Sequence, residues 1–358
     1  MKLLMITQKI DPGHPVLGFA CDWVEELSKQ LDQLFVICFL ASSQISISKT
    51  SIYQIAPLEG YSRIRKMYNF YKSAFAVLKK EKIDGIFVHQ IPLFAILVYP
   101  LAVLKSLPVI LWYTHGHVSF VLKLAQVLVK KILTASKESC RLKSRKIEVI
   151  GHGININKFM QVEKANMNQG VKDSQKRIVS IGRFSPSKDC DTLIEAAREI
   201  IKISGQQNAR FILIGDMLTD DDRIYLDSLR SKVSSYQLDE WITFRGAVPY
   251  NEMHHYYQEA DIVVSTSRTG SLDKVILEAM ASHKPVITCL PLADLYGSYS
   301  SELIFAPGNY HELSKKLIAI LNWDEHKNEE VTDYFFKVTS ENHSLANLMT
   351  AIINEFRR

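Results

Sequence analysis

The hydrophobic pattern of the chain repeats one unit: a short apolar run, a loop of small or polar residues, and an amphipathic stretch with helical spacing. Uninterrupted apolar runs suit parallel strands that are buried on both faces, and amphipathic stretches suit the helices that cover them. In the first part of the chain the predicted strands are residues 2–7, 34–39, 51–55, 83–89, 109–114, 132–136 and 148–155. The predicted helices there are residues 19–31, 63–82, a segment between 89 and 109, and 121–131.

The pattern starts again after residues 160–176, a polar and aperiodic segment that we interpret as a linker. The predicted strands of this second series are residues 177–181, 211–215, 241–244, 261–264, 286–289 and 304–307. The predicted helices are residues 191–203, 220–236, 251–260, one from about 272, 311–321 and a last one at 344–356. This order predicts an α/β protein of two successive domains, at 1–165 and 166–339, each a parallel sheet with helices on both faces.

Residues 86–104 are almost wholly apolar and nearly long enough to span a bilayer. They contain two prolines, and the pattern changes from strand-like to helix-like at Ile91 and Pro92, which favours a buried strand followed by a buried helix over a transmembrane segment. The N-terminus does not have the pattern of a signal peptide. The five cysteines are scattered without C-x-x-C spacing, which predicts a reducing compartment and no zinc site.

The charge is distributed unevenly between the two halves. The chain has a net charge of +5, but residues 1–165 hold 22 Lys and Arg against 11 Asp and Glu, and residues 166–358 hold 21 against 27. A basic half suits nucleic acid, an anionic membrane or an anionic substrate as partner. The predicted helix at 63–82 combines cations with aromatic residues, which indicates either a membrane-facing surface or a solvated helix packed through its aromatics. No standard nucleic-acid-binding module is present, so we expect no nucleic acid partner.

The loops after the first-domain strands exclude one class of enzyme and offer one candidate residue. The loop after the first strand contains Gly13 and Gly18, but their spacing does not give the G-x-G-x-x-G of a dinucleotide-binding enzyme. His115 and His117 follow the strand at 109–114. Ligands of parallel sheets bind beyond the carboxyl ends of the strands, so a histidine there is a candidate site residue.

Residues 265–289 carry the main candidate site of the second domain. A helix is predicted to begin after the loop at Gly270, with Ser271 as its cap and Lys274 adding a cation, and free amides at such a start bind phosphate. Glu278, nearly two turns in, is placed to reach a ribose. The alternative is an ordinary strand–helix–strand crossover with a surface glutamate.

Two more loops complete this candidate site. Arg183 and Lys188 follow the first strand of the second domain, and two cations with oriented amides suit a diphosphate. Residues 244–249, which include Gly246, follow another strand and suit contacts to a base.

These segments resemble the family-4 retaining glycosyltransferases, also called glycosyltransferase group 1. Residues 182–189 are similar to the family's G-R-x-x-x-x-K-G loop, and residues 275–286 to its helix with E-A-M-A followed by P-V. Residues 150–159 are similar to the turn that ends the family's first domain, and residues 244–261 to the segment that approaches the base. The resemblance covers most of the chain.

The resemblance implies the GT-B architecture, in which two Rossmann-like domains face each other across a cleft. It implies that Arg183 and Lys188 hold the donor diphosphate, that Glu278 binds the donor ribose, and that His115 lies near the donor sugar. It further implies that the last helix, about 340–358, crosses back to an acceptor-binding first domain.

The chain departs from the family pattern at one position of this helix start. The family has a second glutamate eight residues before the ribose glutamate, and here that residue is Gly270. The usual E-G-F-G loop reads Gly270-Ser271-Leu272-Asp273. The amides are retained, but the negative charge on the sugar side is lost unless Asp273 supplies it.

The function expected from these observations is a retaining hexosyltransferase that moves a sugar from a nucleotide-diphosphate sugar to a glycan or lipid-linked acceptor. No D-x-D triplet occurs in a plausible loop, so we expect no metal and no cofactor. We expect a cytoplasmic protein, with the basic first domain suited to the inner face of a membrane. Two alternatives remain open: a non-catalytic nucleotide-sugar-binding protein or partner subunit, and a nucleotide-sugar epimerase.

Overall fold

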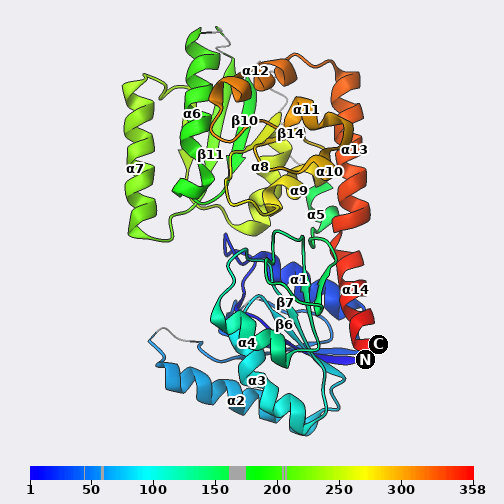
Figure 1. Cartoon of the computed structure of the whole chain (residues 1–358). Helices are drawn as coiled ribbons and strands as arrows, with labels where there is room; N and C mark the ends of the chain where they lie inside the picture. Colours follow the sequence, from blue (N-terminus) through cyan, green and yellow to red (C-terminus); the bar gives the residue numbers. More distant parts are fainter. Residues whose placement is uncertain (44, 58–59, 161–174, 204, 206–207) are drawn as a thin grey trace. The chain divides into compact units, whose positions relative to one another are not determined.

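The computed structural model of the chain describes residues 1–43, 45–57, 60–160, 175–203, 205 and 208–358 (Figure 1). It forms two compact units. Unit 1 comprises Met1–Asn155, Pro249–Asn251 and Asn342–Arg358, and unit 2 comprises Ile156–Val248 and Glu252–Glu341. Most of the linker predicted at 160–176 lies outside the described residues.

Unit 1 is built on a seven-stranded parallel sheet in the order β5-β3-β1-β6-β7-β8-β9. Its strands are β1 (Lys2–Ile6), β3 (Gln33–Cys38), β5 (Thr50–Gln54), β6 (Gly85–His89), β7 (Val109–Trp112), β8 (Lys131–Thr134) and β9 (Ile147–Val149). Its helices are α1 (Phe19–Lys29), α2 (Arg63–Lys80), α3 (Pro92–Leu104), α4 (Phe120–Leu128) and α14 (Leu345–Arg357). The short strands β2 (Lys9–Ile10) and β4 (Leu40–Ala41), which the pattern did not predict, pair with each other.

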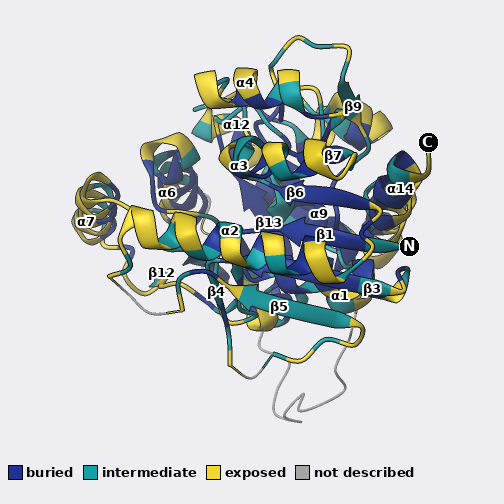
Figure 2. Ribbon diagram, turned by 90° about the horizontal axis from the view of Figure 1, so that it is seen from below, coloured by how far each residue is buried: buried dark blue, intermediate teal, exposed yellow. Residues whose placement is uncertain are grey.

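Alternate residues of each strand of this sheet enter two separate cores. Leu4 and Ile6 pack with α2, α3 and α4, whereas Leu3 and Met5 pack with α1 and α14. This follows from the two-residue period of a strand, which points successive side chains to opposite faces. Unit 1 is therefore three layers, with α2, α3 and α4 on one face of the sheet and α1 and α14 on the other (Figure 2).

Unit 2 contains a five-stranded parallel sheet in the order β12-β11-β10-β13-β14. Its strands are β10 (Lys176–Ile181), β11 (Ala209–Ile214), β12 (Ile242–Arg245), β13 (Ile262–Ser265) and β14 (Val286–Thr288). Its α-helices are α5 (Ile156–Met160), α6 (Cys190–Arg198), α7 (Asp220–Ser235), α8 (Met253–Glu259), α9 (Lys274–Ala281), α10 (Ala293–Tyr296), α11 (Ser300–Leu303), α12 (Tyr310–Leu321) and most of α13 (Glu325–His343). Short 3-10 or π-helical turns lie at Pro186–Lys188, Glu199–Ile203, Tyr250–Glu252 and Gly297–Tyr299.

The order of these strands places a switch point between β10 and β13. The chain runs from β10 outward to β11 and β12, and then returns to add β13 and β14 on the other side. Right-handed crossovers therefore put the connecting helices on opposite faces, and a crevice opens where the direction changes.

Several predicted elements differ in detail. The predicted helix at 191–203 is an α-helix that ends in a π-helical turn, and residues 304–307 form only an isolated bridge between Thr288 and Ile304. The apolar stretch at 86–104 is β6 followed by α3, as predicted. Within the described part of the chain, no helix has both the length and the apolar composition needed to cross a membrane.

The unit boundaries also differ from the expected ones. Helix α5 belongs to unit 2, where Phe159 is buried and its ring lies 5.6 Å from that of Tyr257. Residues 249–251, which we expected in the second domain, belong to unit 1, where the Asn251 amide donates to the Pro12 carbonyl at 3.2 Å. The last helix, predicted at residues 344–356, is α14, which packs with α1, and Asn342–Arg358 belong to unit 1, as the resemblance implied.

Candidate functional site

The candidate site of unit 2 lies at the carboxyl ends of β10 and β13, on the two sides of the switch point. A small hollow there is lined by Gly182, Arg183, Phe184 and Lys188 from the loop after β10 and by Ser265, Thr266 and Ser267 after β13. Two segments that are about 80 residues apart in the sequence thus meet because β10 and β13 are neighbours in the sheet.

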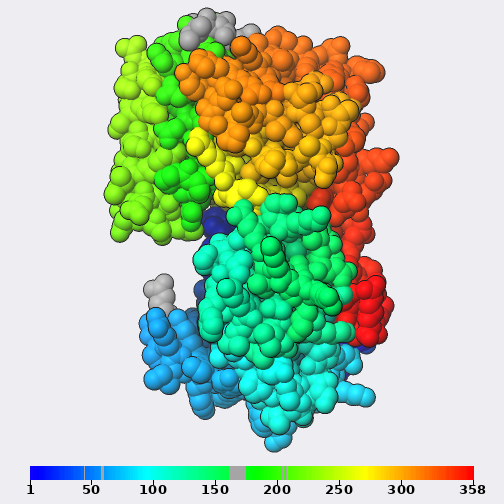
Figure 3. Space-filling model, in the orientation of Figure 1, coloured from blue at the N-terminus to red at the C-terminus, as the bar shows by residue number. Residues whose placement is uncertain are grey.

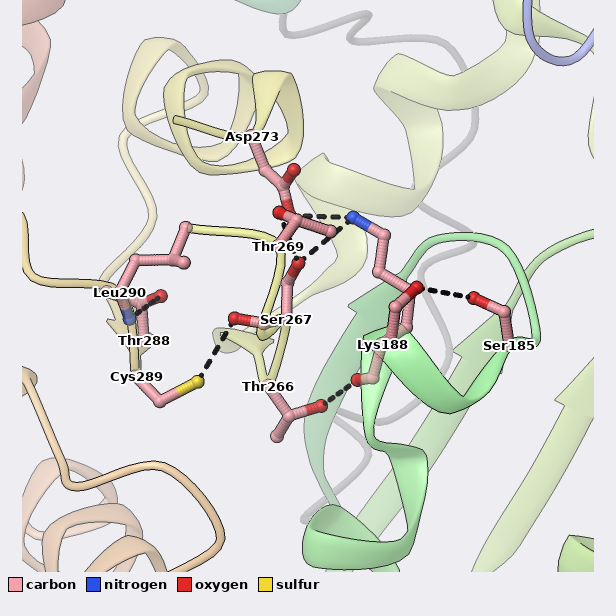
Figure 4. A network of polar contacts seen from close by, with 10 residues as sticks. Ser185, Lys188, Thr266, Ser267, Thr269, Asp273, Thr288, Cys289 and Leu290 are labelled. Carbon is pink, nitrogen blue, oxygen red and sulfur yellow. Dashed lines mark hydrogen bonds and ion pairs between the residues drawn. The ribbon is translucent and has the colours of Figure 1, made fainter. Parts of the chain in front are cut away.

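The Lys188 ammonium points across this hollow toward the loop after β13 (Figure 4). Its Nζ lies 2.7 Å from Oδ2 of Asp273 and 3.2 Å from Oγ of Ser267. The side chains of Lys188 and Asp273 are 22% and 16% exposed, so this ion pair is partly shielded from water. The structure therefore places a cation next to the start of α9, with a carboxylate as its partner.

The backbone of the Lys188 loop is held by three contacts to the loop after β13. The Thr266 hydroxyl donates to the Lys188 carbonyl at 2.7 Å, and the Arg268 amide donates to the Ser187 carbonyl at 2.8 Å. The Arg268 guanidinium contacts Asp189 at 2.8 Å through Nε and 2.5 Å through Nη2. Both nitrogens contact the same carboxylate oxygen, Oδ2, and together with the two backbone contacts they tie the Lys188 loop to the loop after β13.

Asp189 stands where the G-R-x-x-x-x-K-G loop of the glycosyltransferases has its last glycine. The backbone conformation of Asp189 explains why glycine is preferred at this position. Its φ is +48°, in the left-handed region that is costly for residues other than glycine. The carboxylate also accepts a hydrogen bond from Thr192 at 2.6 Å, in addition to the Arg268 contact. These polar contacts offset the strained backbone. The sequence pattern did not predict the roles of Asp189, Arg268 and Thr266. The feature that could have indicated them is the aspartate at the last glycine position of the G-R-x-x-x-x-K-G loop.

Arg183 does not point to the same partners as Lys188, although both line the hollow. Its Nε lies 3.7 Å from Oδ2 of Asp222, a buried residue of the capping box that begins α7. The loop that carries Arg183 continues the sheet, because the Gly182 amide donates to the Ile214 carbonyl and the Phe184 amide to the Asp216 carbonyl. The two predicted cations therefore approach the site from different sides.

The start of α9 differs from the prediction. We expected Ser271 to cap the helix, but the N-cap is Asp273, whose backbone is extended and whose side chain makes no capping bond because it faces Lys188. Lys274 is the first helical residue and Leu272 is buried. The loop before it turns at Gly270, whose φ is +71°. A glycine suits this position because other residues adopt such an angle at a cost.

Glu278 lies one turn into α9 rather than nearly two, because the helix begins later than predicted. It is buried, with 5% of its surface exposed, and Oε2 accepts a hydrogen bond from the Tyr257 hydroxyl at 2.9 Å. A buried carboxylate is stable only when it is hydrogen-bonded, and Tyr257 of α8 satisfies that need. Tyr257 is thus a residue of the site that the sequence analysis did not assign.

Gly246 follows β12 and is open, because no heavy atom lies within 4 Å of the position that a Cβ would take. The neighbouring Arg245 guanidinium lies 5.3 Å above the ring of Tyr256. Backbone groups of this segment are accessible, as contacts to a planar ligand would need.

The candidate residues of unit 1 lie at the carboxyl ends of β1 and β7. Gly13 donates its amide to Oδ1 of Asp11, and Gly18 precedes α1 with its amide bonded to the His14 carbonyl. A Cβ on Gly18 would lie 2.7 Å from that carbonyl oxygen, so the tight turn requires glycine. His115 is exposed after β7, and its Nδ1 accepts a hydrogen bond from the amide of His117 at 3.0 Å.

The part of the chain that the structure describes contains no group of three or more His, Cys, Asp or Glu side chains arranged to hold a metal ion.

A family comparison identifies the part of the chain that carries the unit 2 site. The family model described as glycosyl transferases group 1 matches residues 162–334. This region of the chain is similar to that family. All the unit 2 candidates, from Gly182 to Glu278, lie inside the matched region, whereas Gly13, Gly18 and His115 lie outside it.

Among curated proteins, the chain is similar to alpha-monoglucosyldiacylglycerol synthase of Streptococcus pneumoniae, with 25% identity over 198 residues. The match covers 48% of this chain and 43% of that relative, so it spans less than half of the relative's length.

Two solved structures resemble the whole chain. Sucrose-phosphate synthase from Thermosynechococcus elongatus superposes with a TM-score of 0.77 at 16% identity, covering 99% of this chain and 98% of the other. The Anabaena protein HepE, solved in complex with UDP and glucose, superposes with a TM-score of 0.76 at 17% identity, covering 100% and 99%. The fold is therefore GT-B, with two Rossmann-like parallel-sheet units, as predicted.

Proposed function

We propose that the protein is a retaining glycosyltransferase that uses a nucleoside-diphosphate sugar as donor. The observation that carries the proposal is the Lys188 ammonium at the switch point of the unit 2 sheet, beside the start of α9. Negative charge develops on the diphosphate as it departs, and a cation already oriented there stabilises that charge without further reorganisation. The glycosyltransferase group 1 match over the same residues supports this assignment.

In this proposal Arg183 and Lys188 contact the diphosphate from two sides, and the loop of Gly270, Ser271 and Leu272 contributes amides. Glu278, buried and hydrogen-bonded to Tyr257, binds the ribose, and the open backbone at Gly246 meets the base. HepE was solved with UDP and glucose, which supports a uridine nucleotide as one donor to test. His115 positions the sugar or acceptor.

Front-side substitution is the mechanism that suits these residues. Double displacement needs a carboxylate nucleophile at the sugar, and the position of the expected glutamate is Gly270. In front-side substitution the bond from the anomeric carbon to the phosphate oxygen breaks as the acceptor oxygen bonds to the same face. The leaving phosphate takes the acceptor proton. No metal is needed in this scheme, because the cations supply the charge.

The acceptor that we propose is a glycan or a lipid-linked molecule. The similarity to a streptococcal alpha-monoglucosyldiacylglycerol synthase supports testing lipid acceptors first.

A donor panel tests this proposal. The purified chain is incubated with UDP-, GDP- and ADP-sugars, with and without lipid and glycan acceptors, and nucleotide release and products are measured. We expect release of one nucleoside diphosphate, accelerated by one acceptor class, with the anomeric configuration retained. Tight nucleotide binding without turnover of any donor would favour the non-catalytic alternative. Conversion of the donor without an acceptor would favour the epimerase.

Gly270→Glu tests the non-catalytic alternative directly. We expect the variant to lose about 1 kcal/mol of stability, because a side chain at a φ of +71° is strained, and to gain no activity if the wild type is already an enzyme. Thermal unfolding and the donor panel are measured on the same preparation, with Gly246→Glu as the unstrained control for thermal unfolding alone. New activity in Gly270→Glu, with none in the wild type, would overturn the enzyme assignment.

Asp273→Asn tests how the resident carboxylate competes with a diphosphate. Asp273 neutralises the Lys188 ammonium at 2.7 Å, and an anion bound there would meet its negative charge. We expect the variant to bind UDP about tenfold more tightly, since removing a like charge in a partly shielded site is worth about 1–2 kcal/mol. Calorimetric titration of UDP measures the change. If Asp273 instead supplies the negative charge beside the sugar, UDP affinity stays the same and kcat falls.

A further inference from the structure

The helices α2, α3 and α4 form one outer layer of unit 1, and that layer exposes both apolar and basic side chains. They pack on the same face of the sheet, with α3 in contact with both α2 and α4. Figure 2 shows exposed residues on all three helices, and Figure 3 shows that atoms of the light-blue, cyan and blue-green segments adjoin one another. We call the outward side of this layer the α2–α4 surface, defined by the exposed residues named below.

Helix α3 has the composition of a buried helix but is not fully buried. The sequence Pro92–Leu104 contains no charged residue, and tyrosine is its only side chain with a polar group. A helix that is hydrophobic all round is normally enclosed by the rest of the protein. Here Leu93, Val103 and Leu104 are exposed, Leu104 at 79%.

The two flanking helices each present an apolar stripe to solvent. On α2 the exposed residues Ile64, Tyr68 and Phe75 lie within about 40° of one another around the helix axis, on a different side from the buried Phe70 and Val77. On α4 the exposed residues Phe120, Leu124 and Val127 lie within about 60°. Single exposed apolar residues are common, but aligned stripes on neighbouring helices form a patch that marks an interaction site.

The charge around these stripes has one sign. Residues 60–80 and 85–137 contain no Asp or Glu, and α2 contributes Arg63, Arg65, Lys66, Lys72, Lys79 and Lys80. Within the described residues, these α2 cations form no ion pair, and two of them lie over aromatic rings, Arg65 over Tyr61 and Lys66 over Phe39. Lys72 and Lys79 lie next to the apolar stripe, and both are exposed. Glu81, the C-cap of α2, pairs with Lys2 at 2.7 Å, so the patch combines apolar side chains with α2 cations that form no ion pair within the described residues.

We propose that the α2–α4 surface binds an anionic lipid membrane, on which unit 1 lies without crossing it. Apolar and aromatic side chains enter the boundary between head groups and acyl chains while neighbouring lysines contact anionic head groups. Charge complementarity favours an anionic membrane, because α2 places six cations beside the apolar stripes and residues 60–80 and 85–137 contain no Asp or Glu. The proposal rests on unit 1 and does not depend on the function proposed for unit 2.

Vesicle flotation of the full chain tests the proposal. Vesicles of phosphatidylcholine alone are compared with vesicles that contain about 30% phosphatidylglycerol, at about 0.1 M salt. We expect flotation with the anionic vesicles only. Lys72→Gln/Lys79→Gln should weaken the partition coefficient about 20-fold, because each lysine near such a surface contributes about a fivefold factor. Ile64→Ser/Tyr68→Ser/Phe75→Ser should abolish flotation.

A matched control lies on unit 2, where Leu218 and Ile224 are exposed beside the acidic start of α7. Leu218→Ser/Ile224→Ser should float like the wild type. Thermal unfolding and UDP binding are measured for every variant, so that loss of folding or of the unit 2 site is distinguished from loss of membrane binding. No flotation of the wild type, or equal loss in the α7 control, would overturn the proposal. Self-association that the α2 triple variant removes, without vesicle binding, would assign the surface to a second copy instead.

Discussion

Lys188→Ala is expected to lower the rate of sugar transfer by about 100- to 1000-fold with a smaller effect on the KM of the donor. The ammonium is held at the switch point by Ser267 and Asp273, and its backbone is fixed by Thr266. Because the charge that it meets grows as the diphosphate leaves, its loss affects the transition state more than the bound donor. Steady-state kinetics on the donor identified by the panel measure both constants.

Two further variants separate catalysis from stability. Lys188→Ala leaves the Asp273 carboxylate, which is 16% exposed, without its partner, and this costs about 1–3 kcal/mol of folding free energy. The double variant Lys188→Ala/Asp273→Asn should regain that stability but not the turnover. Lys315→Ala, an exposed lysine on α12, should match the wild type in both. A kcat of Lys188→Ala within threefold of the wild type would contradict the role proposed for this residue.

Gly215→Ala is expected to have the largest effect on stability, about 3 kcal/mol or more. A Cβ on Gly215 would lie 1.9 Å from the carbonyl oxygen of Gly182, and neither backbone can move without breaking the bonds that join the two loops. Overpacking against a flexible side chain costs about 1–3 kcal/mol, and a backbone neighbour yields less. In a unit of this size the loss corresponds to a melting temperature about 6–12 °C lower.

The control for Gly215→Ala is Gly246→Ala, at a glycine that also follows a strand of the same sheet. No heavy atom lies within 4 Å of its Cβ position, so we expect a change within about 0.5 kcal/mol. Thermal unfolding of both variants measures the difference. Since Gly182 adjoins Arg183, Gly215→Ala should also weaken UDP binding. Equal melting temperatures for the two variants would show that the loops can separate without cost.

Most elements could be predicted from the sequence because their signals are local. The apolar run of β1 and the amphipathic spacing of α1 or α14 are properties of adjacent residues, and they carry the period of the structure that they form. The predicted start of α9 was wrong, because it was inferred from local signals alone. Ser271 is a good capping residue, but α9 begins two residues later, after Asp273, whose side chain pairs with Lys188 from a distant segment of the chain.

The sequence by itself determined the α/β class, the two parallel-sheet domains, the basic first half and the cations that follow β10. Only the tertiary structure decided which groups meet. Lys188 and Asp273 are 85 residues apart in the sequence, and Arg268 and Asp189, which also pair, are 79 residues apart. These pairs form because β10 and β13 are neighbours in the sheet, and strand order depends on crossovers rather than on local pattern. In the same way, the apolar composition of α3 follows from the sequence, but the exposure of its side chains depends on how the helix packs on the sheet.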